Sequence, residues 1–141
     1  MGRILAIDFG TKRIGLAVTD PNQIIATALT TIPSAKIFDY LNSYLSKESV
    51  SQFVVGNPKH LDGSESGPIE ALNNFKRALN RMYPSIPLES IDERFTSKIA
   101  FESMILSGAK KKERENKSNI DKISAVIILQ DYLSQLSYRK S

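Results

Sequence analysis

Residues 6–20, "AIDFGTKRIGLAVTD", contain the pattern that decides the fold. Four apolar residues, Ile4 to Ile7, run straight into the carboxylate of Asp8, and two glycines follow within seven positions. Such a continuous apolar run predicts a central strand that is covered on both faces. Because burying an unpaired carboxylate is costly, Asp8 needs a cation, a cluster of hydrogen-bond donors or an exposed strand end. The simpler alternative is that Asp8 only caps the following turn, as Asp commonly does.

The composition is that of an ordinary soluble domain, with 41% hydrophobic and 24% charged residues. A chain of 141 residues fits one domain, residues 1–141. Neither a membrane-spanning run nor a signal-peptide pattern is recognisable, so a cytoplasmic location is expected. Cysteine is absent, which excludes disulfides and thiolate metal sites. The net charge of +4 fits a phosphate-rich partner, although many small soluble proteins are equally basic.

The order of the expected elements indicates a mixed α/β domain. The first three strands can form an antiparallel meander, whereas the later two are separated by helices and should join in parallel. The expected result is one five-stranded sheet with helices packed over it. The strands are expected over residues 3–9, 13–19, 24–31, 51–56 and 88–91, and the helices from an N-cap at Ser34, from Pro68, over about 96–106 and over about 120–136, with a loop over 57–68.

A second acidic position follows the last expected strand. Asp92 and Glu93 are neighbours there, and successive side chains on a strand point to opposite faces, so only one of them can readily share the side of Asp8. The carboxyl ends of parallel strands are where open α/β sheets bind ligands. The structural alternative is an exposed acidic strand end with Arg94 as its salt-bridge partner.

A third acidic position, Asp121, begins the final helix. Helical spacing places it on one face with Ala125, Ile128 and Tyr132, so it stands at the end of an apolar face. Small Ala125 would let this helix lie close to the sheet. The structural alternative is that the helix dipole favours an acid in the first turn.

These three carboxylates can be brought to one edge of the sheet. Such a cluster would repel itself unless a divalent cation were bound in it. Oxygen ligands without Cys or clustered His favour Mg²⁺ or Mn²⁺. Such ions, often in pairs, activate water and stabilise the leaving oxygen in phosphodiester cleavage. The pattern therefore predicts a metal site that includes Asp8.

Four segments in their expected order resemble the YqgF family, also called RuvX, whose members are small bacterial proteins of the RNase H-like fold. This resemblance implies three antiparallel and two parallel strands with helices on both faces. The family is described both as a Holliday junction resolvase and as a nuclease that matures the 5′ end of pre-16S ribosomal RNA. The segments are "IDFGTKRIGLAVTD" (7–20), "VVGNPKHLDGSES" (54–66), "IDERFTS" (91–97) and "KSNIDKISAVIILQDYL" (117–133).

Carried over residue by residue, the resemblance implies that Asp8, Glu93 and Asp121 are the catalytic, metal-binding carboxylates. The family usually has other residue types at three positions, none of which is a proposed ligand: Asn57, Phe95 and Ser118.

Several polar and basic residues of these segments are candidates for phosphate contacts. They are Thr11, Lys12, Arg94 and Lys117. The basic run at 110–114 either follows a nucleic-acid backbone or is a solvated loop, and His60 is given no catalytic role.

Two further classes of function stay open. "DFGTKRIG" also matches the phosphate loop of actin-like ATPases, but those proteins need two such domains and this chain has the length of one. A non-catalytic RNA-binding factor for ribosome assembly is the other alternative, although such a binder gains nothing from carboxylates that face phosphates. Precursor ribosomal RNA is favoured over branched DNA as the substrate by the family's description alone. Ribosomal particles are a candidate partner, and monomer and homodimer are both left open.

Overall fold

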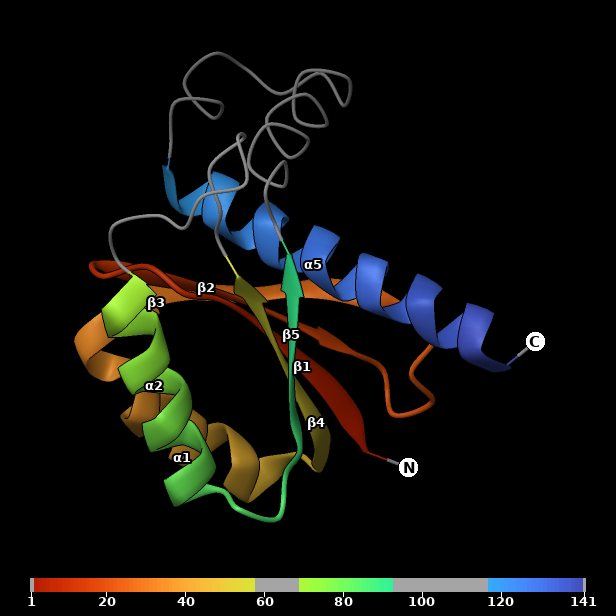
Figure 1. Ribbon diagram of the computed structural model, residues 1–141, viewed down its shortest axis with the longest axis horizontal. Coiled ribbons are helices and arrows are strands. Elements are labelled where there is room, and N and C mark those ends of the chain that lie inside the picture. Colours follow the sequence, from red (N-terminus) through yellow and green to blue (C-terminus); the bar gives the residue numbers. More distant parts are fainter. Residues whose placement is uncertain (1, 58–68, 93–116, 141) are drawn as a thin grey trace.

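The computed structural model describes residues 2–57, 69–92 and 117–140, which form a mixed sheet with helices on both faces (Figure 1). The strand order is β3-β2-β1-β4-β5, so β1 is central, as its apolar sequence predicted. The strands are β1 (Arg3–Asp8), β2 (Arg13–Thr19), β3 (Ala26–Pro33), β4 (Val50–Asn57) and β5 (Leu88–Asp92).

The pairing of the strands confirms the predicted mixture of directions. β1, β2 and β3 are antiparallel neighbours, whereas β1, β4 and β5 run parallel to one another. In the register, Ile7 lies opposite Val55, and Val55 lies opposite Ser90. The three parallel strands therefore end close to the same level, at one edge of the sheet.

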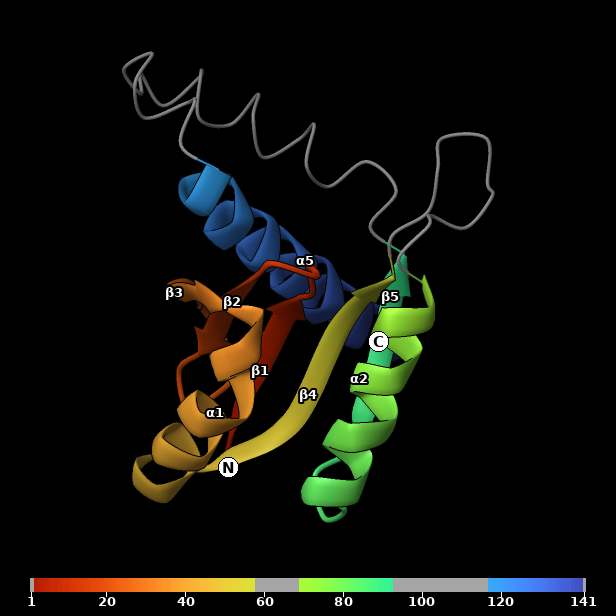
Figure 2. The same cartoon turned by 90° about the vertical axis from the view of Figure 1, so that its left-hand side faces the viewer.

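One face of the sheet is covered by helices α1 (Ile37–Lys47) and α2 (Ile69–Met82). Figure 2 shows both helices on the same side of the strands. The side chains of β1 that point to this face are Leu5 and Ile7, and both are fully buried. They share a core with residues from β2, β4 and both helices, among them Leu16, Phe53, Leu41, Phe75 and Leu79.

The opposite face is covered by the long helix α5 (Lys117–Lys140). From β1, Ile4 and Ala6 point to this side, as alternation along the strand requires. The helix contributes the predicted stripe of Ala125, Ile128 and Tyr132, all buried in the same cluster. The apolar run before Asp8 is thus covered on both faces, as expected.

Strand β3 begins two residues later than the sequence suggested. The carboxylate of Asp20 accepts hydrogen bonds from the backbone N–H groups of Ile24 and Ile25, at 2.8 and 2.7 Å. These bonds hold both isoleucines in the turn, and Gln23 has a positive φ of 60° there. A turn held by side-chain acceptors thus overrides the β-rich composition of 24–25.

The prediction that Ser34 is a helix N-cap is wrong. A 3₁₀ turn, η1 (Ser34–Lys36), precedes α1, and neither it nor α1 has a side-chain cap. The Ser34 hydroxyl instead donates to the backbone carbonyl of Gly10, at 2.5 Å. The Ser34 hydroxyl thus bonds to a residue 24 positions away in the sequence and not to the first turn of the following helix.

The expected helix over 96–106 lies outside the described residues, as does the loop after Asn57 up to position 68. The predicted last helix is longer at both ends than the expected 120–136. None of the helices among the described residues is long and apolar enough to cross a membrane.

Candidate functional site

The candidate site lies at the edge where the three parallel strands end. Figures 1 and 2 show the arrowheads of β4 and β5 and the N-terminal end of α5 on the same side of the molecule. Asp8 is the last residue of β1, and it pairs with Gly15 of β2. Its side chain is partly exposed, in contrast to the four buried residues before it. The strand thus brings a carboxylate out of the core at its carboxyl end.

The residue after Asp8 fixes the face on which Asp8 stands. The ring of Phe9 stacks on Phe75 of α2, with ring centroids 4.8 Å apart and planes inclined by 24°. Phe9 therefore belongs to the face covered by α1 and α2. Because neighbours alternate, Asp8 lies on the α5 side with Ala6. On β5, the side chain of Ile91 packs in the core of that same α5 side.

The predicted third carboxylate, Asp121, belongs to the first turns of α5. Ala125, one helical turn later, is fully buried in the α5-side core. Position 121 therefore lies one helical turn before this buried residue, near the N-terminal end of α5.

The remaining predicted residues are only partly described. Lys117 is the first residue of α5, and its side chain and that of Asp121 lie outside the described part of the chain. Glu93, Arg94, His60 and the basic run at 110–114 also lie outside it. Among the side chains that the structure does describe, no three acidic, His or Cys groups form a potential metal site.

The turn after Asp8 presents the two predicted phosphate contacts, Thr11 and Lys12, and both are exposed. Gly10 has no room for a side chain, because a Cβ there would lie 2.4 Å from the carbonyl oxygen of Arg13. From the end of the neighbouring strand β3, Ser34 donates its hydroxyl to the Gly10 carbonyl and its backbone N–H to the Lys12 carbonyl, at 2.5 and 2.9 Å. Sequence reasoning missed this role of Ser34, since no local pattern signals a contact over 24 positions.

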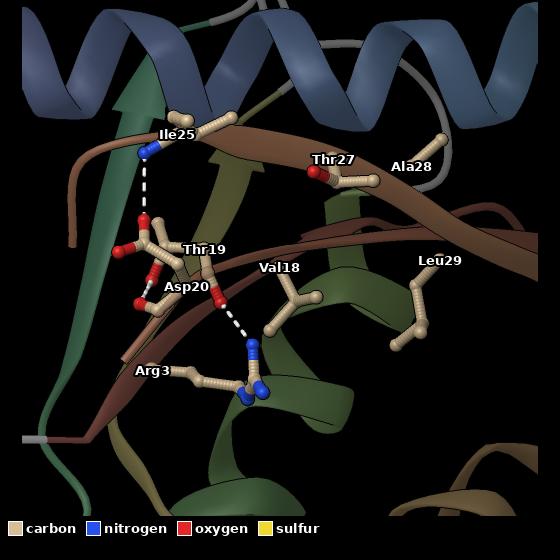
Figure 3. A pocket seen from close by; sticks show the side chains of 8 residues that line it. All are labelled: Arg3, Val18, Thr19, Asp20, Ile25, Thr27, Ala28 and Leu29. Atoms are coloured by element: carbon tan, nitrogen blue, oxygen red, sulfur yellow. Dashed lines mark hydrogen bonds between the residues drawn. The ribbon is translucent and has the colours of Figure 1, made fainter. Parts of the chain in front are cut away.

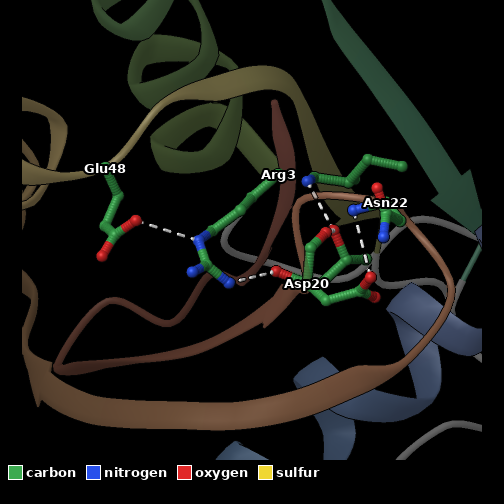
Figure 4. A network of polar contacts seen from close by, with 6 residues as sticks. Arg3, Asp20, Asn22 and Glu48 are labelled. Atoms are coloured by element: carbon green, nitrogen blue, oxygen red, sulfur yellow. Dashed lines mark hydrogen bonds and ion pairs between the residues drawn. The ribbon is translucent and has the colours of Figure 1, made fainter. Parts of the chain in front are cut away.

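The opposite end of the sheet carries a different polar cluster (Figure 4). The guanidinium of Arg3, at the start of β1, forms an ion pair with Glu48 at 3.2 Å. It also donates to the backbone carbonyl of Thr19 at 2.9 Å. The Thr19 hydroxyl in turn accepts from the backbone N–H of Ile4, at 2.9 Å. This cluster joins the beginning of β1 to the end of β2.

Asp20 is the second acidic residue of this cluster, after Glu48, and its carboxylate is hydrogen-bonded by the backbone. It accepts from the N–H groups of Asn22, Ile24 and Ile25, at 3.0, 2.8 and 2.7 Å. These hydrogen bonds, led by that from Ile25, hold the pKa of the Asp20 carboxyl below its ordinary value of 3.8. Asp20 is a turn-forming residue, and its carboxylate is hydrogen-bonded by the backbone of its own turn.

A pocket of about 340 Å³ also lies at this opposite end (Figure 3). Arg3, Thr19 and Asp20, which line it, are already engaged in the contacts described above. It contains no predicted site residue and lies at the end of β1 remote from Asp8. The lining residues are Arg3, Val18, Thr19, Asp20, Ile25, Thr27, Ala28 and Leu29.

Comparison with known protein families matches residues 2–135 to the family model described as "RuvX: Holliday junction resolvase". A protein of Flavobacterium johnsoniae named "Putative pre-16S rRNA nuclease" is 49% identical over 134 residues, covering 95% of this chain and 97% of its own length. A protein of the same name from Phocaeicola vulgatus is 48% identical over 138 residues and covers 98% of this chain and 99% of its own.

Solved structures support the fold. A structure of Thermus thermophilus RuvC in complex with a Holliday junction substrate aligns with a TM-score of 0.56 and 11% identity, covering 97% of each chain. Another structure of the T. thermophilus protein aligns with a TM-score of 0.51, covering 96% of each chain. At this identity the likeness concerns the arrangement of the strands and helices, and it agrees with the RNase H-like fold expected from the sequence.

Proposed function

Because this chain belongs to the RuvX family, we propose that it is a cytoplasmic nuclease that processes the 5′ end of pre-16S ribosomal RNA. The family match covers residues 2–135, and relatives that are nearly half identical to this chain are named "Putative pre-16S rRNA nuclease". The structural observation that supports the proposal most is the position of Asp8. This carboxylate stands partly exposed at the end of a central strand whose residues 4–7 are buried.

We propose that Asp8, Glu93 and Asp121 together hold a divalent cation. Ile91 packs on the α5 side of the sheet, and a strand continued by two residues would give Glu93 the same side. That alternation favours Glu93 over Asp92 as the partner of Asp8. Helical spacing puts position 121 on the same face of α5 as Ala125, which is buried in the α5-side core, and this supports Asp121 as a ligand.

The donor set fits a hard cation, since all three ligands would be carboxylates and the chain has no cysteine. Bound Mg²⁺ or Mn²⁺ would activate water and stabilise the leaving oxygen of a phosphodiester. The buried strand before Asp8 restricts where its carboxylate can lie, and this pre-sets the geometry of the site.

The substrate phosphates would be held by the turn after Asp8. Thr11 offers a hydroxyl and Lys12 an ammonium group, both on the exposed surface of the turn. We assign Arg94 and Lys117 to the same task, since each is close in sequence to a proposed ligand. Contacts of this kind recognise the backbone of a nucleic acid and leave its base sequence unread.

A second candidate substrate is the four-way DNA junction, which the description of the family model favours. A resolvase of this kind should act as a symmetric dimer that makes paired cuts. An RNA-processing enzyme should instead depend on 2′-hydroxyl groups or on single-stranded bases.

The test is cleavage of two labelled substrates, a pre-16S leader RNA and a four-way DNA junction, with Mg²⁺, with Mn²⁺ and with EDTA. Metal-dependent cutting of the RNA alone is expected, and cutting of the junction alone would replace the substrate proposal. If neither is cut, the same assay on precursor ribosomal particles follows. Failure there as well would overturn the nuclease proposal in favour of a binding factor.

A further inference from the structure

We propose that Ser34 is a positioning residue that sets the turn after Asp8 in a phosphate-binding conformation. This inference rests on the proposed function, since it assigns the turn to the nucleic-acid substrate. Ser34 lies outside the four segments that resemble the family, at the far end of β3 and the start of η1.

Two hydrogen bonds join Ser34 to the turn. Its hydroxyl donates to the carbonyl of Gly10 at 2.5 Å, and its backbone N–H donates to the carbonyl of Lys12 at 2.9 Å. The Gly10 carbonyl belongs to the peptide plane between residues 10 and 11, and the Lys12 carbonyl to the plane between residues 12 and 13, so Ser34 fixes one peptide plane before Thr11 and one after Lys12. Only the first bond depends on the identity of the side chain, and that bond can be removed by substitution.

The direction of the Gly10 carbonyl determines the direction of a hydrogen-bond donor, the backbone N–H of Thr11. All described peptide bonds are trans, and in a trans peptide the N–H points opposite to the C=O. Because the Gly10 carbonyl points to Ser34, the N–H of Thr11 points away from Ser34. The exposed turn can thus present the N–H of Thr11 beside its hydroxyl and the ammonium group of Lys12. Such a set of donors suits a phosphate oxygen.

The turn is also anchored at its other end. Phe9 stacks on Phe75, which in turn contacts Phe38 with ring centroids 5.8 Å apart. The close approach of Gly10 to the Arg13 carbonyl leaves no room for a side chain inside the turn. The stacked ring of Phe9 fixes the start of the turn, and the hydroxyl of Ser34 fixes the next residue, Gly10.

A turn that is held in its binding conformation loses less freedom when substrate binds. Ser34→Ala removes one hydrogen bond, and we expect it to raise KM about fivefold and to change kcat less than about twofold. Ser34→Thr keeps the hydroxyl and should restore the KM of the natural protein. The matched control is Ser46→Ala, because the Ser46 hydroxyl also donates to a backbone carbonyl, that of Ser43, at 2.6 Å.

The experiment measures KM and kcat for the cleaved substrate, nucleic-acid affinity in EDTA, and amide hydrogen exchange at residues 10–13. Faster exchange and weaker affinity in Ser34→Ala, reversed in Ser34→Thr and absent in Ser46→Ala, are the expected results. Unchanged affinity with faster exchange would reduce Ser34 to a structural residue and overturn the inference. Unchanged exchange would overturn it as well.

Failure of the proposed function has a different signature. In that case the natural protein cleaves no substrate, while the affinity in EDTA and the exchange rates still report whether Ser34 positions the turn. Equal affinity of all four proteins would then refute the positioning role independently of any cleavage.

Discussion

Asp8 and Asp20 stand at opposite ends of the sheet, and in the sequence they look alike. Asp8 is the last residue of β1 and Asp20 directly follows β2, and each is the first acid after an apolar run. Asp20 accepts three hydrogen bonds from the backbone of its own turn. Asp8 lies at the edge where three parallel strands end, on the side that faces α5.

This difference shows that strand direction decides what an acid after a strand does. β2 ends in a tight connection to β3, and the backbone N–H groups of that connection donate to the carboxylate of Asp20. β1 ends beside two parallel strands, where the carboxyl ends of several elements meet and ligands commonly bind. An acid after an apolar run therefore has a structural role at one end of the sheet and, in our proposal, a catalytic role at the other.

The largest effect is expected for Asp8→Asn. Loss of a residue that only supports a metal ligand costs about 10- to 100-fold, so loss of a ligand should lower the cleavage rate more than about 100-fold. The matched control is Asp39→Asn on the exposed surface of α1, which should cleave at the natural rate. Circular dichroism would confirm that both variants fold. A folded Asp8→Asn protein with the natural rate would contradict the catalytic assignment.

The two glycines at the ends of β1 offer the next comparison. A Cβ at Gly10 would lie 2.4 Å from the Arg13 carbonyl oxygen, and one at Gly2 would lie 2.9 Å from the Ser51 nitrogen. Gly10→Ala and Gly2→Ala should each lower the free energy of unfolding by about 1–3 kcal/mol through overpacking. Only Gly10→Ala should also weaken nucleic-acid binding, measured by titration in EDTA. Equal loss of affinity in both variants would show that the two ends are not distinct.

Most of the fold could be predicted from the sequence because hydrophobic patterning dominates it. The run Ile4 to Ile7 predicted a central strand, and the spacing of Ala125, Ile128 and Tyr132 predicted the buried stripe of α5. The late start of β3 and the role of Ser34 could not be predicted. Both depend on hydrogen bonds of the assembled structure: from the Ile24 N–H to the Asp20 carboxylate, and from the Ser34 hydroxyl to the Gly10 carbonyl. For the candidate site, the sequence indicated acids at the ends of strands and at the start of the last helix, and a topology that could bring them to one edge; the register of β1, β4 and β5 then shows that these strands end at the same level.

A smaller effect is expected for Asp20→Asn, and it should depend on pH. The folded pKa of Asp20 is lowered, so its contribution to stability is present above pH 3.8 and is lost as pH falls through the folded pKa. The unfolding temperatures of the variant and the natural protein should thus differ at neutral pH and converge in acid. Cleavage should stay at the natural rate. A constant difference in unfolding temperature over the whole pH range would refute this account.

The smallest effect is expected for Glu48→Gln. Its ion pair with Arg3 is only partly buried, with 43% of the Glu48 side chain and 25% of the Arg3 side chain accessible, so its loss should cost less than about 1 kcal/mol. Arg3 keeps its hydrogen bond to the Thr19 carbonyl in this variant. Denaturant unfolding at low and high salt measures the change, which salt should reduce. A larger loss, insensitive to salt, would mean that the Arg3 cluster is more than a surface contact.

The most direct test of the central claim is a titration of ¹⁵N-labelled protein with Mn²⁺, followed by the paramagnetic broadening of backbone amide signals. The account predicts broadening at the edge that contains Asp8, Gly10 and Asn57, with sharp signals at Asp20 and Ile25. It also predicts that Asp8→Asn abolishes the broadening and that Asp20→Asn leaves it intact. Broadening centred on Asp20, or broadening that survives Asp8→Asn unchanged, would contradict the assignment of the metal site.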